Sequence, residues 1–329
     1  MNKVMLYCEM NDLTGFGHYN RMKILLKIMN LRNVDIITDN LKIAKVFFTN
    51  QNVLKVTDAQ EYIKQNYKKY NLLIIDPPYY PNIIDQQKKF SLDFKKIYNL
   101  KDKNFKVIWF TDEENPSPKY CDLLLNDYPL SISFRKFYRK YNKNIELILG
   151  LYAFLFADEV LKLINLSKKK HVLIAFGGND PKNLVLKYFN FFKKIKYKKI
   201  FISNSKTYKI LKKFSDNKNL FIKKKTPMDQ FIKILASSHF YIGTPSNIMF
   251  EALALGVRGN VIPTQKRQVK MGKAFAIKNY INLLPYYKNL NIAKLRKEIN
   301  LEFSNKLKFN LNEKLVENTR KKLMNFLGK

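Results

Sequence analysis

The sequence is poor in the residues that build disulfide frameworks and metal clusters. Its 329 residues include two cysteines, Cys8 and Cys121, and three histidines, His18, His171 and His239. Two isolated cysteines, each in or beside an expected strand, predict buried reduced thiols, because disulfide frameworks and zinc sites need more cysteines at closer spacing. The histidines are too few and too scattered to form a metal-binding motif.

Long apolar runs are also missing, and we expect no leader segment in the first residues. The longest apolar stretch, Leu147–Ala157, is too short for a bilayer, which requires about 20 residues. The first ten residues carry Lys3 and Glu9 around a short apolar core and have no small-residue cleavage site. We therefore expect a first strand there rather than a signal peptide, and a cytoplasmic protein.

Acidic residues are scarce, with 26 Asp and Glu against 61 Lys and Arg, and the formal net charge is +35. The abundance of Lys, Asn, Ile, Tyr and Phe is typical of AT-rich coding sequence, but that bias does not explain the shortage of acids. A field this positive favours anionic partners such as phosphorylated sugars, and it also suits weak peripheral contact with an anionic membrane surface at its inner face. Nucleic acid is not expected, since no nucleic-acid-binding module is visible.

Apolar residues make up 46% of the chain and aromatics 14%, enough for packed cores in two domains. Strand-length apolar runs alternate with segments of helical spacing. The expected strands are Val4–Cys8, Val34–Thr38, Leu72–Ile75, Val107–Phe110, Leu123–Leu125, Val172–Phe176, Ile200–Ser203, Leu220–Ile222, His239–Ile242 and, last, Val261–Ile262.

This alternation predicts an α/β chain of two doubly wound, parallel-sheet, Rossmann-like domains, at residues 1–165 and 166–329. Basic helices are expected after Leu290, and they could pack back on the first domain. Ligands of such folds bind outside the carboxyl ends of the strands. Four segments leave expected strands at that end, and they carry the candidate site residues.

The first of these segments is Gly15-Phe16-Gly17-His18-Tyr19-Asn20-Arg21. Gly15 and Gly17 allow backbone N–H groups to approach a ligand, and the helix that follows favours an anion at its N-terminus. Arg21 lies one turn into that helix, where it could reach a phosphate or a carboxylate. His18 stands at the rim of this turn, and a histidine side chain suits general acid or base work. A glycine turn that is purely structural is the alternative.

The second segment is Asp76-Pro77-Pro78-Tyr79-Tyr80, directly after a buried strand. The prolines stiffen the loop and hold the tyrosines outward. Carboxylates at strand ends are frequent in functional sites, although they also cap neighbouring helices. We therefore take Asp76 and Tyr79 as candidates.

The third segment, Gly177-Gly178-Asn179-Asp180-Pro181-Lys182-Asn183, opens the second sheet in the same way. Gly177 and Gly178 could form a floor for a pyrophosphate or a sugar. The alternative is a capped turn, because Asp180 or Asn183 can cap the following helix.

In the fourth segment, Gly243 to Glu251, Ser246 could cap the next helix and donate to a phosphate. Glu251 lies about one turn further along. It could accept hydrogen bonds from both hydroxyls of a ribose, or it could simply be a favourable charge near the helix N-terminus. Gly256 suits the C-cap of this helix.

Taken in order, these segments resemble one family, the UDP-sugar hydrolases of pseudaminic-acid biosynthesis and the related spore-coat polysaccharide proteins, which have the MurG-like GT-B fold. The matched segments are Gly15–Arg21, Asp76 with Tyr79, Asp112, Cys121–Leu125, Gly150–Leu155, Gly177–Asn183, Pro245–Glu251 and Leu255–Val257. The resemblance implies a GT-B fold, with a sugar-binding catalytic domain first, a nucleotide-binding domain second, and the reactive site in the cleft between them.

The resemblance also implies roles for single residues. His18 matches the general base that activates water for attack at the anomeric carbon, and Tyr79 matches a residue beside the sugar. Substrate binding is implied for Gly15, Gly17, Arg21, Asp76, Gly177, Gly178 and Asn183, phosphate binding for Ser246 and Asn247, and ribose binding for Glu251. The products are UDP and a free amino-deoxy sugar for nonulosonic-acid and surface glycan synthesis. No cofactor or metal is expected, because helix N-termini and other donors stabilise the leaving diphosphate, and we expect a monomer.

Two other functions fit the same residues. A GT-B glycosyltransferase would use His18 to deprotonate an acceptor hydroxyl, and the charge of +35 suits an enzyme with a membrane-bound acceptor. A binding or assembly protein without turnover is favoured by Pro245, which stands where the family has glycine and lacks a backbone N–H donor.

Overall fold

The computed structural model describes residues 3–8, 17–76, 92–100, 105–112, 118–166, 171–177, 180, 182–216, 218–299 and 313–327. The chain divides into two units, the first formed by Met1–Leu155 together with Lys314–Lys329 and the second by Phe156–Glu313. The chain therefore leaves the first unit after Leu155 and returns to it at Lys314.

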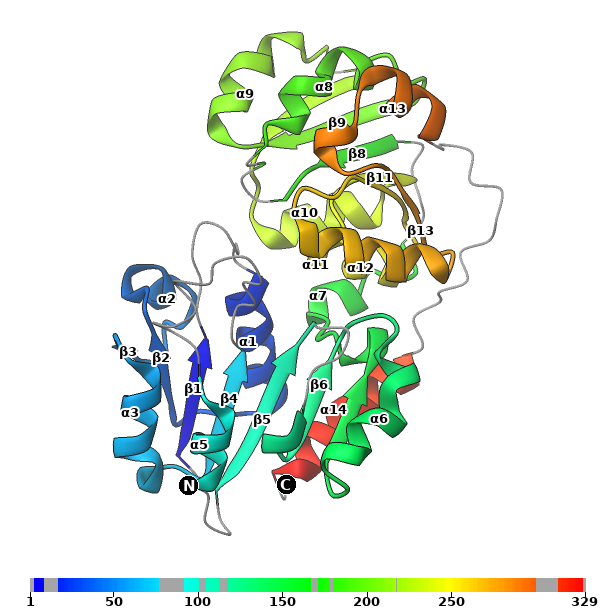
Figure 1. Ribbon diagram of the computed structural model, residues 1–329. Helices are drawn as coiled ribbons and strands as arrows, with labels where there is room; N and C mark the ends of the chain where they lie inside the picture. Colours follow the sequence, from blue (N-terminus) through cyan, green and yellow to red (C-terminus); the bar gives the residue numbers. More distant parts are fainter. Residues whose placement is uncertain are drawn as a thin grey trace. The chain divides into compact units, whose positions relative to one another are not determined.

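The sheet of the first unit contains seven strands within the described residues, and every neighbouring pair is parallel. Their order is β3-β2-β1-β4-β5-β6-β7, so the connection from β3 to β4 crosses over β1 and β2. The strands are β1 (Val4–Cys8), β2 (Val34–Thr38), β3 (Asn52–Lys55), β4 (Leu72–Asp76), β5 (Lys106–Thr111), β6 (Leu123–Asn126) and β7 (Glu146–Leu149). Figure 1 shows the labelled strands of this sheet pointing in the same direction.

Alternate residues of β1 enter the cores on the two faces of this sheet. Leu6 belongs to a cluster with residues of the helix Gly17–Ile28, whereas Met5 and Tyr7 belong to the cluster on the other face. This arrangement explains the continuous apolar runs, since a strand covered on both faces has no polar side.

The α-helices described in the first unit are α1 (Gly17–Ile28), α2 (Leu41–Phe47), α3 (Ala59–Asn66), α5 (Phe94–Asn99), α6 (Arg135–Tyr141) and α14 (Glu313–Phe326), with short 3-10 turns at Tyr67–Lys69, Pro118–Tyr120, Ser131–Phe134 and Gly150–Ala153. Side-chain caps define where several of them begin. Asn40 accepts a hydrogen bond from the Ile43 N–H, and Asp58 accepts one from the Glu61 N–H. These caps satisfy backbone donors that the helix itself leaves unpaired.

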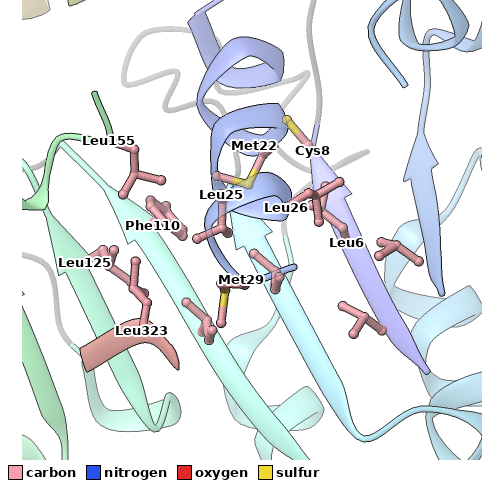
Figure 2. Close-up of a cluster of buried hydrophobic side chains, with 14 of the residues drawn as sticks. Leu6, Cys8, Met22, Leu25, Leu26, Met29, Phe110, Leu125, Leu155 and Leu323 are labelled. Carbon is pink, nitrogen blue, oxygen red and sulfur yellow. The ribbon is translucent and has the colours of Figure 1, made fainter. Parts of the chain in front are cut away.

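Helix α14 joins the first unit from the far end of the sequence. Its buried residues Val316, Thr319 and Leu323 recur at helical spacing. Leu323 is fully buried in the cluster that also contains Leu25 and Leu125. Figure 2 shows Leu323 beside Leu125, with side chains of α1 packed across the neighbouring strands. The first core is therefore completed only when the C-terminal helix docks.

The sheet of the second unit repeats the topology with six strands in the described part of the chain, in the order β10-β9-β8-β11-β12-β13 and again all parallel. The strands are β8 (His171–Ala175), β9 (Lys198–Ser203), β10 (Leu220–Lys224), β11 (Phe240–Gly243), β12 (Arg258–Val261) and β13 (Ile281–Leu283). The order reverses between β8 and β11, as it does between β1 and β4 in the first sheet.

The described α-helices of the second unit are α7 (Asp158–Leu161), α8 (Leu184–Phe192), α9 (Ser205–Leu211), α10 (Met228–Ala236), α11 (Asn247–Ala254), α12 (Lys266–Ile277) and α13 (Ile292–Glu298), with 3-10 turns at Lys212–Phe214 and Tyr287–Asn289. Helix α11 is terminated by Gly256, which follows the C-cap residue Leu255, and the sequence predicts a C-cap at this glycine. Gly256 has a φ of +67°, its N–H donates to the carbonyl of Leu253, and the N–H of Val257 donates to that of Ala252. This is the Schellman C-cap, which needs a residue that tolerates a positive φ.

The prediction of two doubly wound α/β halves is confirmed, and three strands are additions to it. Strand β3 is partly exposed at the edge of its sheet and has no apolar run that would reveal it. Strand β7 ends directly before Gly150–Leu155, one of the segments matched in the family resemblance, and no strand was expected there. Strand β13 follows β12, so the expectation that Val261–Ile262 is the last strand was wrong.

Candidate active site

A buried cluster of charged side chains lies at the carboxyl end of the first sheet. His18 and Arg21 stand on the first turns of α1, directly after β1, and Asp76 is the last residue of β4. Asp127 follows β6. Strands β1 and β4 are neighbours where the strand order reverses. Doubly wound sheets bind their ligands at this position.

His18 and Asp76 form a hydrogen-bonded pair in this cluster. The Nδ1 atom of His18 is 3.0 Å from Oδ1 of Asp76. His18 is 8% exposed and Asp76 is fully buried. Burial alone would raise the pKa of Asp76, but its interactions with Arg21 and His18 outweigh burial and lower that pKa. An ionised Asp76 can only accept, so Nδ1 donates in this pair, and when the ring is neutral Nε2 keeps the lone pair. The pair therefore provides the tautomer that a general base needs.

Arg21 is bound inside the protein by two carboxylates. Its Nε donates to Oδ2 of Asp76 at 3.1 Å, its Nη2 donates to Oδ1 of the same group, and its Nη1 donates to Oδ2 of Asp127 at 3.1 Å. Burial alone would lower the pKa of Arg21, but Asp76 and Asp127 raise it. The carboxylates that Arg21 reaches in this structure thus belong to the protein itself, and its role toward a substrate stays a prediction.

Asp127 belongs to the cluster although it was absent from the sequence candidates. It is 3% exposed, and its Oδ1 atom has no hydrogen-bond partner among the described residues. Burial raises its pKa to about 7, with Asp112 and Asp76 adding to the shift and Arg21 opposing it. The sequence signal that could have identified Asp127 is the one that identified Asp76, namely a carboxylate directly after a buried strand.

Asp180 shapes the corresponding loop after β8 in the second unit. Its two carboxylate oxygens accept from the N–H groups of Leu184 and Val185, each at 2.9 Å. Of the two caps that the sequence offered, Asp180 is therefore the one that binds the first turn of α8. Asn183 has a left-handed backbone with φ +51° and makes no side-chain cap. Gly177 has φ +74°, a conformation that glycine adopts without strain.

The loop from β11 to α11 leaves the N-terminus of α11 without a side-chain cap. Ser246 occupies the N-cap position, but its hydroxyl accepts from the Thr244 hydroxyl at 3.2 Å instead of bonding a helix N–H. Ser246 and Asn247 are both partly exposed. A helix N-terminus with accessible N–H groups favours an anionic ligand.

Glu251, one turn into α11, carries a carboxyl group that has no counter-ion in the described residues. The residue keeps part of its surface accessible, yet its Oε2 atom is shielded from solvent and lacks a hydrogen-bond partner there. Burial raises the pKa of this carboxyl to about 8. Such an unsatisfied acceptor indicates a place for a ligand donor.

Tyr241 and Gly243 set the backbone geometry where the second sheet reverses its strand order. The Tyr241 hydroxyl donates to the carbonyl oxygen of Ala175, on the adjacent β8, at 2.9 Å. A Cβ placed on Gly243 would lie 1.9 Å from that hydroxyl oxygen. Gly243 is therefore needed because the tyrosine side chain passes over it.

Three sequence candidates, Gly15, Tyr79 and Gly178, lie outside the described residues. Gly17 is the first residue of α1 and adjoins His18. The structure thus gathers His18, Arg21 and Asp76 in the first unit, and Ser246, Asn247 and Glu251 along one helix of the second. Among the described residues, no group of three or more His, Cys, Asp or Glu is placed to hold a metal ion.

The described helices contain none with the length and apolar character needed to cross a membrane. A comparison with known protein families finds no match for this chain. It is similar to an uncharacterised protein of Methanocaldococcus jannaschii, with 27% identity over 275 residues that cover 78% of this chain and 54% of that protein. The chain thus spans about half the length of the curated relative that it matches.

Solved structures give the broader comparison. The chain resembles the MurG crystal structure from Acinetobacter baumannii, with a TM-score of 0.61 and 11% identity over 98% of this chain and 95% of that one. It also resembles a spinosyn rhamnosyltransferase complexed with thymidine diphosphate, with a TM-score of 0.58 and 11% identity over 99% and 96% of the two chains.

Both similarities extend over nearly the whole length of this chain and of the chain compared with it, and they include both parallel sheets. The chain has the GT-B fold.

Proposed function

We propose that this protein is a GT-B glycosyltransferase that uses a nucleoside diphosphate sugar, with UDP as the expected nucleotide. The observation that carries the proposal is the His18–Asp76 pair at the carboxyl end of the first sheet. The similar structures add support, because those above are a MurG and a rhamnosyltransferase complexed with thymidine diphosphate. The enzyme class and the donor are inferences from the site together with the fold.

In the proposed reaction, Nε2 of His18 takes the proton of an acceptor hydroxyl while that oxygen bonds to the anomeric carbon. The bond between the anomeric carbon and the diphosphate oxygen breaks, and its electron pair leaves with UDP. Asp76 holds the imidazole through Nδ1 and stabilises the positive charge that develops on the ring, a role known for carboxylates that pair with catalytic histidines. A positioned general base of this kind contributes about 10²–10⁴-fold to the rate.

The nucleotide half of the proposed site is in the second unit. The N–H groups at the start of α11, with Ser246 and Asn247, would hold the diphosphate, since a helix N-terminus stabilises negative charge. Glu251 would accept hydrogen bonds from the ribose hydroxyls, which would satisfy its unpaired Oε2. Pro245 supplies no N–H donor in this loop, so the diphosphate depends on the remaining groups.

Hydrolysis of a UDP-sugar is the second candidate. The ordered motifs from Gly15 to Val257 favour it, since they resemble the pseudaminic-acid hydrolases. The chemistry differs only in the nucleophile, because the same histidine can deprotonate water. The released sugar would then be a free amino-deoxy sugar.

The deciding experiment measures UDP release from a panel of UDP-sugars, including the diacetamido-trideoxy-altrose derivative. Each sugar is tested without an acceptor and with detergent-solubilised lipid and protein acceptor fractions. We expect UDP binding without acceptor and UDP release only when an acceptor is present. Rapid release of UDP and free sugar without an acceptor would identify the hydrolase instead. Absence of nucleotide binding and of release under all conditions would contradict both functions.

A further inference from the structure

Asp127 is the member of the buried cluster to which the proposed chemistry assigns no task. Its carboxylate accepts a hydrogen bond from Nη1 of Arg21. The same guanidinium donates hydrogen bonds to Asp76 through Nε and Nη2. Asp76 in turn holds the His18 ring. One arginine thus connects Asp127 with the proposed base over three hydrogen-bonded steps, from Asp127 to Arg21, from Arg21 to Asp76 and from Asp76 to His18.

Before any reaction takes place, the buried cluster contains more negative charge than positive charge. Arg21 and Asp76 neutralise each other, so an ionised Asp127 adds a second buried negative charge. When His18 accepts a proton, the cluster contains two positive and two negative groups. Asp112 also acts on Asp127, but it is partly exposed and water screens its charge. The buried charges are therefore balanced in the state that proton transfer to His18 produces.

We propose that Asp127 is a positioning residue for the His18–Asp76 pair, which it orients through Arg21 and whose protonated state it balances in charge. This inference rests on the proposed role of His18 as a base. Buried charges that are fixed in advance stabilise a developing charge without reorganisation during the reaction.

The position of Asp127 makes this role dependent on pH. The charged and titratable groups around it are Arg21 on α1, Asp76 at the end of β4 and Asp112 after β5, with His18 next to Asp76. Its pKa of about 7 means that Asp127 gains a proton as the pH falls below neutrality. Arg21 then keeps one ionised carboxylate, and the charge that balances a protonated His18 is lost.

The first test is kinetic and compares Asp127→Asn and Asp127→Ala with the matched control Asp35→Asn. Asp35 is also a buried carboxylate paired with a cation, with Lys3 at 2.8 Å, but it stands near the amino end of β2. We expect kcat for sugar transfer to fall about 10–100-fold in both Asp127 variants, as for a displaced catalytic group. KM should change less than about threefold, since binding groups remain in place. The control should keep the wild-type kcat and pH profile.

The shape of the pH profile separates positioning from a structural role. Wild-type kcat should rise as the pH increases through about 7, where Asp127 ionises. The profile of Asp127→Asn should lack the part of this rise that Asp127 contributes, because asparagine does not titrate, and the pH dependence that remains belongs to the proposed base. A wild-type profile in Asp127→Asn would overturn the proposal, as would an unchanged kcat.

The second test needs no enzymatic activity, so it distinguishes this inference from the proposed function. With three histidines in the chain, ¹⁵N-histidine labelling resolves the ring tautomers by NMR. In the wild type, ¹³C-labelled aspartate should report the ionisation of Asp127, and the His18 ring signals should shift with the same midpoint. In Asp127→Ala the Nδ1–H signature of His18 should weaken. His18 ring signals that do not shift as Asp127 titrates would contradict the proposal even if the enzyme is active.

Discussion

Nδ1 of His18 lies 3.0 Å from Oδ1 of Asp76, although 58 positions separate the two residues in the sequence. The contact forms because β1 and β4 are adjacent parallel strands and Cys8 is paired with Asp76 in their register. Residues that leave the carboxyl ends of adjacent strands necessarily meet. The proposed base is therefore held by a carboxylate from a neighbouring strand.

The first prediction concerns the proposed base. His18→Ala should lower the rate of UDP release by about 10²–10⁴-fold, since it removes the group that accepts the proton. UDP affinity, measured by calorimetry, should stay close to wild type, because Ser246 and Glu251 belong to the other unit. The control His239→Ala, at the amino end of β11, should keep both quantities. Loss of UDP affinity together with turnover in His18→Ala would mean that His18 is structural.

The second prediction concerns Arg21, the counter-ion shared by two buried carboxylates. Arg21→Met should lower the free energy of unfolding by about 3–5 kcal/mol at pH 7, because Asp76 and Asp127 lose their cation in a buried site. The deficit should shrink as the pH falls and protons replace that cation. Urea unfolding at several pH values measures this effect. Arg32→Met, at an exposed position, is the control and should change little.

The third prediction concerns the pH dependence that Glu251 confers. Its folded pKa of about 8 lies above its ordinary value of 4.5, so the folded state binds the proton more tightly. The contribution of the Glu251 carboxyl to the free energy of unfolding is fully present below pH 4.5 and is lost as the pH rises toward 8. Glu251→Gln should therefore flatten this part of the stability profile in urea unfolding. An unchanged slope between pH 5 and pH 8 would show that the carboxyl is solvated.

Ligand binding gives a fourth prediction at the same residue. If both ribose hydroxyls donate to Glu251, the carboxylate form binds best, and UDP affinity should increase as the pH rises toward about 8. Binding should then release a proton, which calorimetry detects in buffers with different ionisation enthalpies. Glu251→Gln should lose this pH dependence. Affinity that is independent of pH in the wild type would argue against contact between the ribose and Glu251.

A fifth prediction tests how the C-terminal helix contributes to the first unit. Leu323→Ala should lower the free energy of unfolding by about 2–5 kcal/mol, because it leaves a cavity among fully buried side chains. Leu315→Ala is the matched control on the same helix, since Leu315 is 40% exposed. A substitution at Leu323 that changes stability no more than the control would mean that α14 is dispensable for the core.

The sequence was informative wherever local physics decides the structure. Continuous apolar runs such as Leu72–Ile75 predicted buried parallel strands, and Gly256 predicted a C-cap, because both depend on neighbouring residues alone. The same local view missed β3 and β13. An exposed edge strand and a three-residue strand bury too few side chains to leave a pattern, and their existence depends on the neighbour that they pair with.

The features of the candidate site also divide into those that the sequence predicted and those that only the structure revealed. The sequence by itself determined that His18, Arg21 and Asp76 follow buried strands, and therefore that they stand at the ligand-binding edge of a parallel sheet. Only the tertiary structure decided that Arg21 turns inward to two carboxylates, that Asp127 joins them, and that Glu251 has no counter-ion in the part of the chain that the structure describes. Pairing between charged groups depends on distances across the sheet and on exclusion of water, and neither quantity is encoded by spacing along the chain.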